Sequence, residues 1–240
     1  MIQLEILIRE VKLSIIIPTL NEAKNLPLLL SDLGEIRDIS EILIVDSNSI
    51  DATKDIASIY NVKCLNSEFK NRGLQLNKGA IEAKGQWFLF IHADSRLNKN
   101  WSKEINNIIS KENEFIYFFR FKINSTKFIY RLLELSVNLR TLFLRTPYGD
   151  QGLLIKKEIF YKYEGYKNIP IMEDIDFINR LKIKETLHSL KTPIFTSNRK
   201  WQKRNILYQS LMNYSLRRKW SRGFSINDLY EDYYDTKKTN

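Results

Sequence analysis

The chain is poor in the residues that build disulfides and histidine metal sites. Its 240 residues include one cysteine and two histidines. The single cysteine, Cys64, rules out an internal disulfide and fits a reducing compartment. Cys64 lies in an expected core strand, so we do not expect it to act as a nucleophile. Two histidines, His92 and His188, exclude a multi-histidine metal centre.

Long apolar runs and glycine-rich phosphate loops are also missing. Charged residues interrupt every apolar stretch before it reaches the length of a membrane span. Glu5, Arg9, Glu10 and Lys12 interrupt any signal-peptide core, so we expect a cytoplasmic protein. The chain has neither the G-x-G-x-x-G fingerprint nor the P-loop pattern. It also has no repeat and no Pro/Gly linker, which predicts a single domain over residues 1–240.

Strand and helix patterns alternate along the first hundred residues. Strands are expected at residues 13–17, 41–46, 62–65 and 87–92, and helices at residues 25–33, 51–60, 72–84 and 98–110. Gly85 is the expected C-cap of the third helix. Later segments predict a strand at residues 115–121, a helix at 128–144 and a short strand at 153–155.

This order of elements predicts an α/β fold. The sheet should be mainly parallel, with helices on both faces and a helical C-terminal segment. Residues 13–100 would form a nucleotide-binding half, and residues 101–240 an acceptor-side half of the same domain.

Polar residues cluster where three of the expected parallel strands end. The first strand ends in PTLNE (residues 18–22), the second in Asp46, and the fourth in His92-Ala93-Asp94. The carboxyl ends of parallel strands lie at one edge of a sheet, so these groups should converge on one crevice. The Asp94 carboxylate suits a divalent cation that bridges substrate phosphates. Alternatively, Asp94 caps the helix expected at residues 98–110.

Five short motifs occur together in a characteristic order. They are residues 14–22 (SIIIPTLNE), 44–53 (IVDSNSIDAT), 92–94 (HAD), 147–152 (PYGDQG) and 172–176 (MEDID). Together they resemble family 2 glycosyltransferases of the GT-A fold, over nearly the whole chain. The combination of His-Ala-Asp, Tyr-Gly-Asp-Gln-Gly and Met-Glu-Asp is similar to that of a small bacterial subgroup. The resemblance implies a hexosyltransferase that uses a nucleotide sugar, UDP-linked, and Mn²⁺ or Mg²⁺.

The resemblance assigns roles to single positions. It places Pro18, Thr19, Asn21 and Glu22 at the nucleotide, Asp46 at the base, Asp94 at the metal and Asp174 at the acceptor hydroxyl as general base. His92 stands where many relatives have an aspartate, so it would contact the ribose or a metal-bound water instead. Ser47 stands in place of a second base-binding aspartate. A Gln-x-x-Arg-Trp motif is absent, which argues against processive polymer synthesis.

Candidate residues in three segments of the chain have a second interpretation. Asp174 precedes an apolar-periodic helix and would deprotonate the acceptor, but it could also be the N-cap of that helix. Asp150 and Gln151 lie between two glycines and, with Glu173, would shape the acceptor side; the alternative is a plain tight turn. Arg72 is either a phosphate or base contact or an ordinary surface arginine.

The net charge is +10, and the excess is concentrated towards the C-terminus, where no Asp or Glu occurs between Thr186 and Asn227. Nucleic acid, an anionic membrane, a phosphorylated small molecule or a solvated basic face would each explain this stretch. Carboxylates at strand ends argue against nucleic-acid binding. The absence of glycine from residues 18–25 argues against the other alternative, a sugar-1-phosphate nucleotidylyltransferase. The acid-free stretch also carries aromatic residues that favour the boundary between water and lipid: Trp201, Tyr208, Tyr214 and Trp220. We expect residues 199–224 to form part of the acceptor side, to lie against the inner face of an anionic membrane and to deliver an amphipathic or lipid-linked acceptor.

Overall fold

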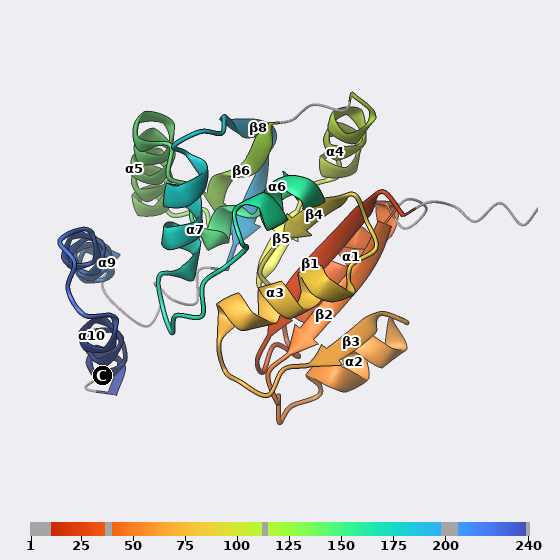
Figure 1. Cartoon of the computed structure of the whole chain (residues 1–240), viewed down its shortest axis with the longest axis horizontal. Helices are drawn as coiled ribbons and strands as arrows, with labels where there is room; N and C mark the ends of the chain where they lie inside the picture. Colours follow the sequence, from red (N-terminus) through yellow and green to blue (C-terminus); the bar gives the residue numbers. More distant parts are fainter. Residues whose placement is uncertain (1–10, 37–39, 112–114, 198–205, 239–240) are drawn as a thin grey trace, which may run out of the picture.

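The computed structural model describes residues 11–36, 40–111, 115–197 and 206–238. Eight strands in these ranges form one sheet, in the order β3-β2-β1-β4-β7-β6-β8-β5 (Figure 1). The strands are β1 Leu13–Thr19, β2 Ser40–Asp46, β3 Lys63–Asn66, β4 Trp87–Phe90, β5 Ser95–Leu97, β6 Ile116–Ile123, β7 Leu153–Lys156 and β8 Leu187–Thr196. The helices are α1 Leu26–Asp32, η1 Leu33–Ile36, α2 Thr53–Ile59, α3 Arg72–Glu82, α4 Trp101–Ser110, α5 Phe128–Leu144, η2 Gly149–Gln151, α6 Lys157–Lys162, α7 Glu173–Leu181, α9 Ile206–Ser221 and α10 Ile226–Lys238.

The first four expected strands form the parallel part of the sheet. β1 pairs in parallel with β2 and β4, and β2 pairs in parallel with β3. β7 joins antiparallel to β4, and β6 and β8 extend the sheet beyond it. The predicted α/β fold with a mainly parallel sheet and C-terminal helices is confirmed. Because β4 and β7 are neighbours, strands from both predicted halves of the chain belong to one sheet.

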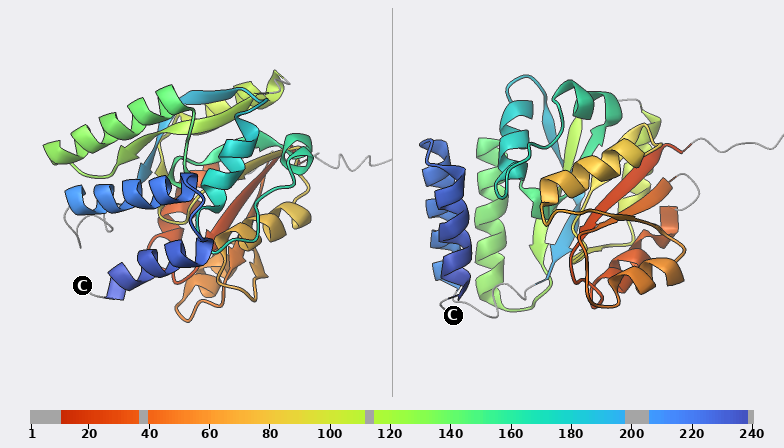
Figure 2. Two further views of the ribbon diagram at one scale, coloured as in Figure 1. Left: turned by 60° about the vertical axis from the view of Figure 1, so that its left-hand side comes forward. Right: turned by 60° about the horizontal axis from the view of Figure 1, so that its bottom comes forward.

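The strands β1, β2 and β4 are buried on both faces of the sheet, which explains why they are nearly continuous apolar runs. Ile15 and Ile17 of β1 pack with residues of α1 and α4, whereas Ile16 packs with residues of α3, α6 and α7. α9 and α10 lie beside α5, at the side of the molecule opposite β3 (Figures 1 and 2). No helix within the described ranges is long and apolar enough to cross a membrane.

Two local predictions were wrong. Gly85 is not a left-handed C-cap: α3 ends in the extended residue Ala83. A Cβ at Gly85 would lie 2.7 Å from the backbone nitrogen of Ser14, so glycine is required there by close approach to β1. The helix expected from residue 98 begins only at Trp101, because Asn98 forms a turn in which its carbonyl accepts from the N–H of Trp101 and its Oδ1 accepts from the N–H of Asn100.

We expect Gly79→Ala to destabilise the fold by about 1–3 kcal/mol through overpacking. Gly79 lies in α3 where the helix crosses the sheet, and a Cβ there would be 2.4 Å from Cγ2 of Ile16. Gly34→Ala is the matched control, because no atom lies within 4 Å of its Cβ position. Urea unfolding measures both variants, and equal losses of stability would contradict the packing argument.

Candidate active site

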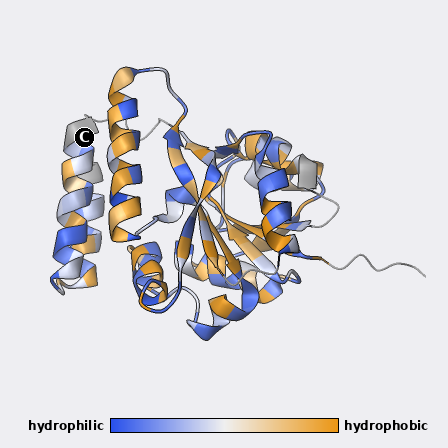
Figure 3. Ribbon diagram, turned by 90° about the horizontal axis from the view of Figure 1, so that it is seen from above, coloured by the Kyte–Doolittle hydropathy of each residue, from blue (hydrophilic) through white to orange (hydrophobic). Residues whose placement is uncertain are grey.

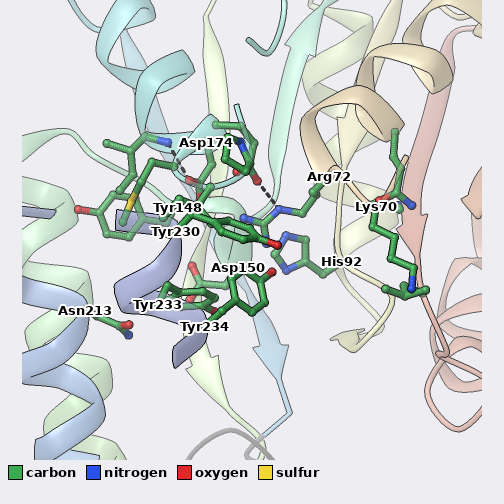
Figure 4. A pocket seen from close by; sticks show the side chains of 18 of the residues that line it. Lys70, Arg72, His92, Tyr148, Asp150, Asp174, Asn213, Tyr230, Tyr233 and Tyr234 are labelled. Atoms are coloured by element: carbon green, nitrogen blue, oxygen red, sulfur yellow. Dashed lines mark hydrogen bonds and ion pairs between the residues drawn. The ribbon is translucent and has the colours of Figure 1, made fainter. Parts of the chain in front are cut away.

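A cavity of about 790 Å³ lies where β1 and β4 end (Figure 4). Its walls come from the loops after these strands, the starts of α3 and α7, the η2 turn, and α9 with α10. The predicted residues that line it are Pro18, Thr19, Glu22, Arg72, His92, Asp94, Asp150, Glu173 and Asp174. The cavity lining does not include Asn21, Asp46 or Gln151, which support it from behind.

Asp46 holds the end of β1 rather than forming the cavity surface. Its side chain is fully buried, and its Oδ1 accepts a hydrogen bond of 3.0 Å from Oγ1 of Thr19. The backbone N–H of Ser49 donates to its Oδ2 at 2.8 Å. Asn21 has φ +56°. Its Oδ1 accepts a hydrogen bond of 2.9 Å from the backbone N–H of Ile50, which joins the loop after β1 to the loop after β2. These contacts fix the shape of the loop that carries Thr19.

Gln75 is a structural contributor that the sequence patterns did not reveal. It is buried, and its Nε2 donates to the carbonyls of Thr19 and Val45, at 3.0 and 2.6 Å. It thereby ties α3 to the ends of β1 and β2 and also reaches the cavity. Lys70, in the loop before α3, is a further lining residue that no motif indicated (Figure 4).

Arg72 and Glu173 form an ion pair at the cavity wall. Nε of Arg72 donates to Oε1 of Glu173, whose side chain is only 3% exposed. Burial raises the pKa of Glu173, Arg72 opposes that rise, and the charge of Asp174 adds to it. Arg72 is therefore not an ordinary surface arginine, because it pairs with a buried carboxylate at the cavity wall.

Asp174 is held in place by two backbone N–H groups. Its Oδ2 accepts from Gly149 at 2.8 Å, and its Oδ1 accepts from Ile175 at 2.8 Å. The N-cap interpretation is wrong, because Met172 occupies that position with φ +65° and Asp174 lies inside the first turn of α7. The carboxylate is thus oriented towards the cavity by both α7 and the η2 turn.

The glycines around Asp150 and Gln151 allow the η2 turn to lie close to neighbouring side chains. A Cβ at Gly149 would lie 3.0 Å from Nε2 of His92 and 3.2 Å from Oδ2 of Asp174. Gly152 has φ +62°, as the turn interpretation expects, so the segment is both a turn and a cavity wall. Gln151 is fully buried; its Oε1 accepts from Oγ1 of Thr141 at 3.0 Å, so it supports the turn from below.

α9 and α10 both supply side chains to the cavity. α9 belongs to the stretch 199–224 that was predicted on the acceptor side, whereas no sequence pattern assigned α10 to a site. Arg217 of α9 lies over the ring of Tyr148, 5.3 Å from its centroid, and Arg140 of α5 lies over the same ring at 3.9 Å. The α10 lining residues are Tyr230, Tyr233 and Tyr234 (Figure 4). Tyrosines spaced by three and four residues share one helix face, and this spacing was the signal available in the sequence.

α9 and α10 pack against the loop that precedes α7. Leu216 of α9 and Leu229 of α10 are buried against Ile171. The basic stretch expected at the membrane is therefore divided: part of it, including Arg217, faces the cavity. Arg199, Lys200, Trp201, Lys203 and Arg204 lie outside the described residues.

Asp94 lines the cavity from the loop between β4 and β5, and its N-cap interpretation is wrong because Asn100 occupies the N-cap of α4. No three His, Cys, Asp or Glu side chains are grouped as a metal site in the described ranges. Mg²⁺ is often held by one or two carboxylates together with substrate phosphates. The oxygen ligand of Asp94 therefore fits an ion completed by a substrate diphosphate, and not one caged by protein alone.

Two solved structures with a similar fold were determined with a nucleotide sugar bound. Staphylococcus aureus TarS (residues 1–349), in complex with UDP-GlcNAc, has a TM-score of 0.64 and 18% sequence identity; 78% of this chain and 59% of TarS are covered. The mannosyltransferase PcManGT from Pyrobaculum calidifontis, in complex with GDP-Man and Mn²⁺, has a TM-score of 0.60 at 15% identity, covering 86% and 60%. The fold is that of the GT-A glycosyltransferases.

The family follows from the sequence match. Residues 14–170 match the family described as glycosyl transferase family 2, so the chain belongs to glycosyltransferase family 2. Proteins of Mycobacterium bovis and Mycobacterium tuberculosis named "PGL/p-HBAD biosynthesis glycosyltransferase" are 36% identical over 91 residues. That match covers 35% of this chain and 36% of the length of these curated relatives. The membership favours a glycosyltransferase over the nucleotidylyltransferase and nucleic-acid-binding alternatives.

Proposed function

We propose that the chain transfers a sugar, a hexose, from a UDP-linked donor to an acceptor hydroxyl, with inversion at the anomeric carbon. The observation that carries the proposal is a single cavity in which Asp94 and Asp174 are supplied by separate segments, after β4 and at the start of α7. Similar folds that hold UDP-GlcNAc, or GDP-Man with Mn²⁺, support the donor class.

On the donor side, Asp94 would hold Mn²⁺ or Mg²⁺ together with the diphosphate, and the ion would neutralise the leaving nucleotide. Arg72 and Lys70 lie on the cavity wall and would add positive charge near the phosphates. Pro18, Thr19 and Glu22 would border the nucleotide. Asp46 is fully buried beneath Thr19, so we assign it to the shape of the base pocket through that contact.

On the acceptor side, Asp174 would accept the proton of the attacking hydroxyl. The new bond forms between the acceptor oxygen and the anomeric carbon while the bond from that carbon to the diphosphate breaks. Two fixed N–H groups keep the carboxylate of Asp174 in one orientation, which favours this role. Asp150 and the α10 tyrosines would surround an amphipathic or lipid-linked acceptor at the inner face of the membrane.

Thermal unfolding with a panel of nucleotide sugars tests the proposal. A donor that binds the native state at about 100 times its Kd stabilises it by about 2.7 kcal/mol. We expect stabilisation by a UDP-sugar in the presence of Mn²⁺, and release of UDP once a suitable acceptor is added. If no nucleoside diphosphate sugar raises the unfolding temperature with or without metal, the proposed function is wrong.

A further inference from the structure

One face of α5 is apolar and exposed along its whole length. Its residues Phe128, Leu132, Leu135, Leu139, Leu142 and Phe143 are spaced by three, four or one positions, so they share one side of the helix. Their exposed fractions run from 42% for Leu139 to 76% for Phe143. Figure 3 shows the hydrophobic colour recurring along this helix. We call these six residues the apolar face of α5.

The opposite side of α5 already has a partner within the fold. Tyr130 packs against Phe121 and Ile123 of β6, and Glu134 accepts from the backbone of Ile123 at 2.6 Å. The helix is therefore held firmly by its inner side. Nothing within the described residues covers the apolar face, because its six members are all exposed.

Positive charge borders the apolar face at both ends. Lys127 precedes α5 and Arg145 follows it, and both are exposed. Glu134 is the single acid of the helix, and it is buried and ion-paired with Arg131 at 2.7 Å. An apolar helix face with cationic ends and no exposed acid is the pattern of a helix that lies in the plane of an anionic bilayer.

The neighbouring helix α9 also exposes aromatic, apolar and basic side chains. α5 and α9 lie side by side in both views of Figure 2. The outer residues of α9 include Tyr208, Leu211 and Tyr214, exposed by 47, 67 and 55%, with Arg218 also exposed. Tyrosine and arginine of this kind suit the boundary between water and lipid.

A second copy of the chain complements the apolar face of α5 less well. In an antiparallel pair of α5 helices, Lys127 of one copy would meet Arg145 of the other. In a parallel pair, each cation would meet its own counterpart. Either arrangement brings like charges together, whereas anionic lipid headgroups neutralise both ends.

We propose that the apolar face of α5 inserts into the headgroup boundary of an anionic bilayer, with Lys127 and Arg145 on the lipid phosphates. The C-terminal end of α5 leads directly to Tyr148 and Asp150 at the cavity, so a bilayer bound there adjoins the acceptor side. The delivery of a lipid-anchored acceptor to the cavity rests on the proposed function; the docking itself does not. The proposal adds α5 to the basic stretch predicted at the membrane; within that stretch Arg217 contacts Tyr148 and Lys219 pairs with Asp232 at 2.5 Å.

Vesicle flotation tests the docking with the full chain. We expect binding to phosphatidylcholine vesicles that contain phosphatidylglycerol, weaker binding at high salt, and little binding to phosphatidylcholine alone. In Leu132→Ser/Leu139→Ser the partition coefficient should fall at least about tenfold, because two leucines lose their burial in lipid. The matched control is Ile59→Ser/Ile81→Ser, which replaces two residues of α2 and α3 that are 79 and 72% exposed. The control should bind like the wild type.

Two outcomes would overturn the proposal that α5 docks on a bilayer. Equal flotation of Leu132→Ser/Leu139→Ser and the wild type would show that the apolar face of α5 does not contact lipid. A wild-type dimer in sedimentation that this variant dissociates, without vesicle binding, would assign the face to a second copy. Thermal stabilisation by the donor separates the docking proposal from the proposed function. Both variants should be stabilised by the donor as much as the wild type. If the wild type floats normally but no donor stabilises it, only the proposed function is contradicted.

Discussion

Asp174→Asn is expected to lower turnover by about two to four orders of magnitude, the usual contribution of a general base. The amide cannot accept the acceptor proton, yet it has nearly the size of the carboxylate and keeps one oxygen for the N–H of Gly149. Donor affinity should therefore survive. Steady-state release of UDP measures turnover, and thermal stabilisation by the donor measures binding.

Asp176→Asn is the matched control for this prediction. Asp176 lies in the same first turn of α7, but it pairs with Arg180 at 2.8 Å and Lys167 at 3.1 Å and is not part of the cavity lining. The Asp176→Asn substitution should lower the stability of the fold and change turnover little. Near-normal turnover of Asp174→Asn would move the base to another carboxylate, with Glu173 and Asp150 as the candidates.

Asp94→Asn is expected to abolish the part of donor binding that depends on Mn²⁺. Removing a charged oxygen ligand at a diphosphate site should weaken donor affinity in Mn²⁺ by about a hundredfold or more, since metal contacts with phosphate contribute several kcal/mol. Stability without ligands should barely change, because the side chain borders the cavity instead of filling the core. Isothermal titration with and without Mn²⁺ measures the effect.

The control for the metal prediction is an exposed aspartate outside the cavity. Asp55 lies on α2, and Asp55→Asn should bind the donor with unchanged affinity and metal dependence. If Asp94→Asn keeps native affinity in Mn²⁺, then Asp94 does not hold the ion.

Two adjacent carboxylates, Glu173 and Asp174, have different surroundings. Successive helix residues point about 100° apart, as the helical repeat of 3.6 residues requires. Glu173 accordingly points to Arg72 of α3 and is almost completely buried, whereas Asp174 points to Gly149 and the cavity. The ion pair anchors the start of α7 to α3. Removing Arg72 would leave the buried charge of Glu173 uncompensated.

Local patterns in the chain were enough to predict the parallel half of the sheet. Strands β1, β2 and β4 are short apolar runs followed by polar residues, and such runs form wherever both faces of a sheet are covered. The same patterns predicted that Asp94 and the residues after β1 meet, because the ends of parallel strands share an edge. The motif resemblance then named family 2, which the match over residues 14–170 shows.

The part of the cavity wall formed by η2, α7 and α9 depends on contacts between segments that are far apart in the chain. Arg72 meets Glu173, Gly149 meets Asp174, and Arg217 meets Tyr148, and no local pattern specifies which partner a side chain will reach. β8 was not predicted because Leu187, Leu190 and Ile194 follow no period of two and Pro193 interrupts the segment; only pairing with β6 shows that it belongs to the sheet. The helix at 128–144 was predicted with its observed bounds, but its exposed apolar face could be recognised only after the fold showed which side of α5 packs on β6. Periodicity reports that a helix has an apolar side; tertiary packing decides whether that side is covered.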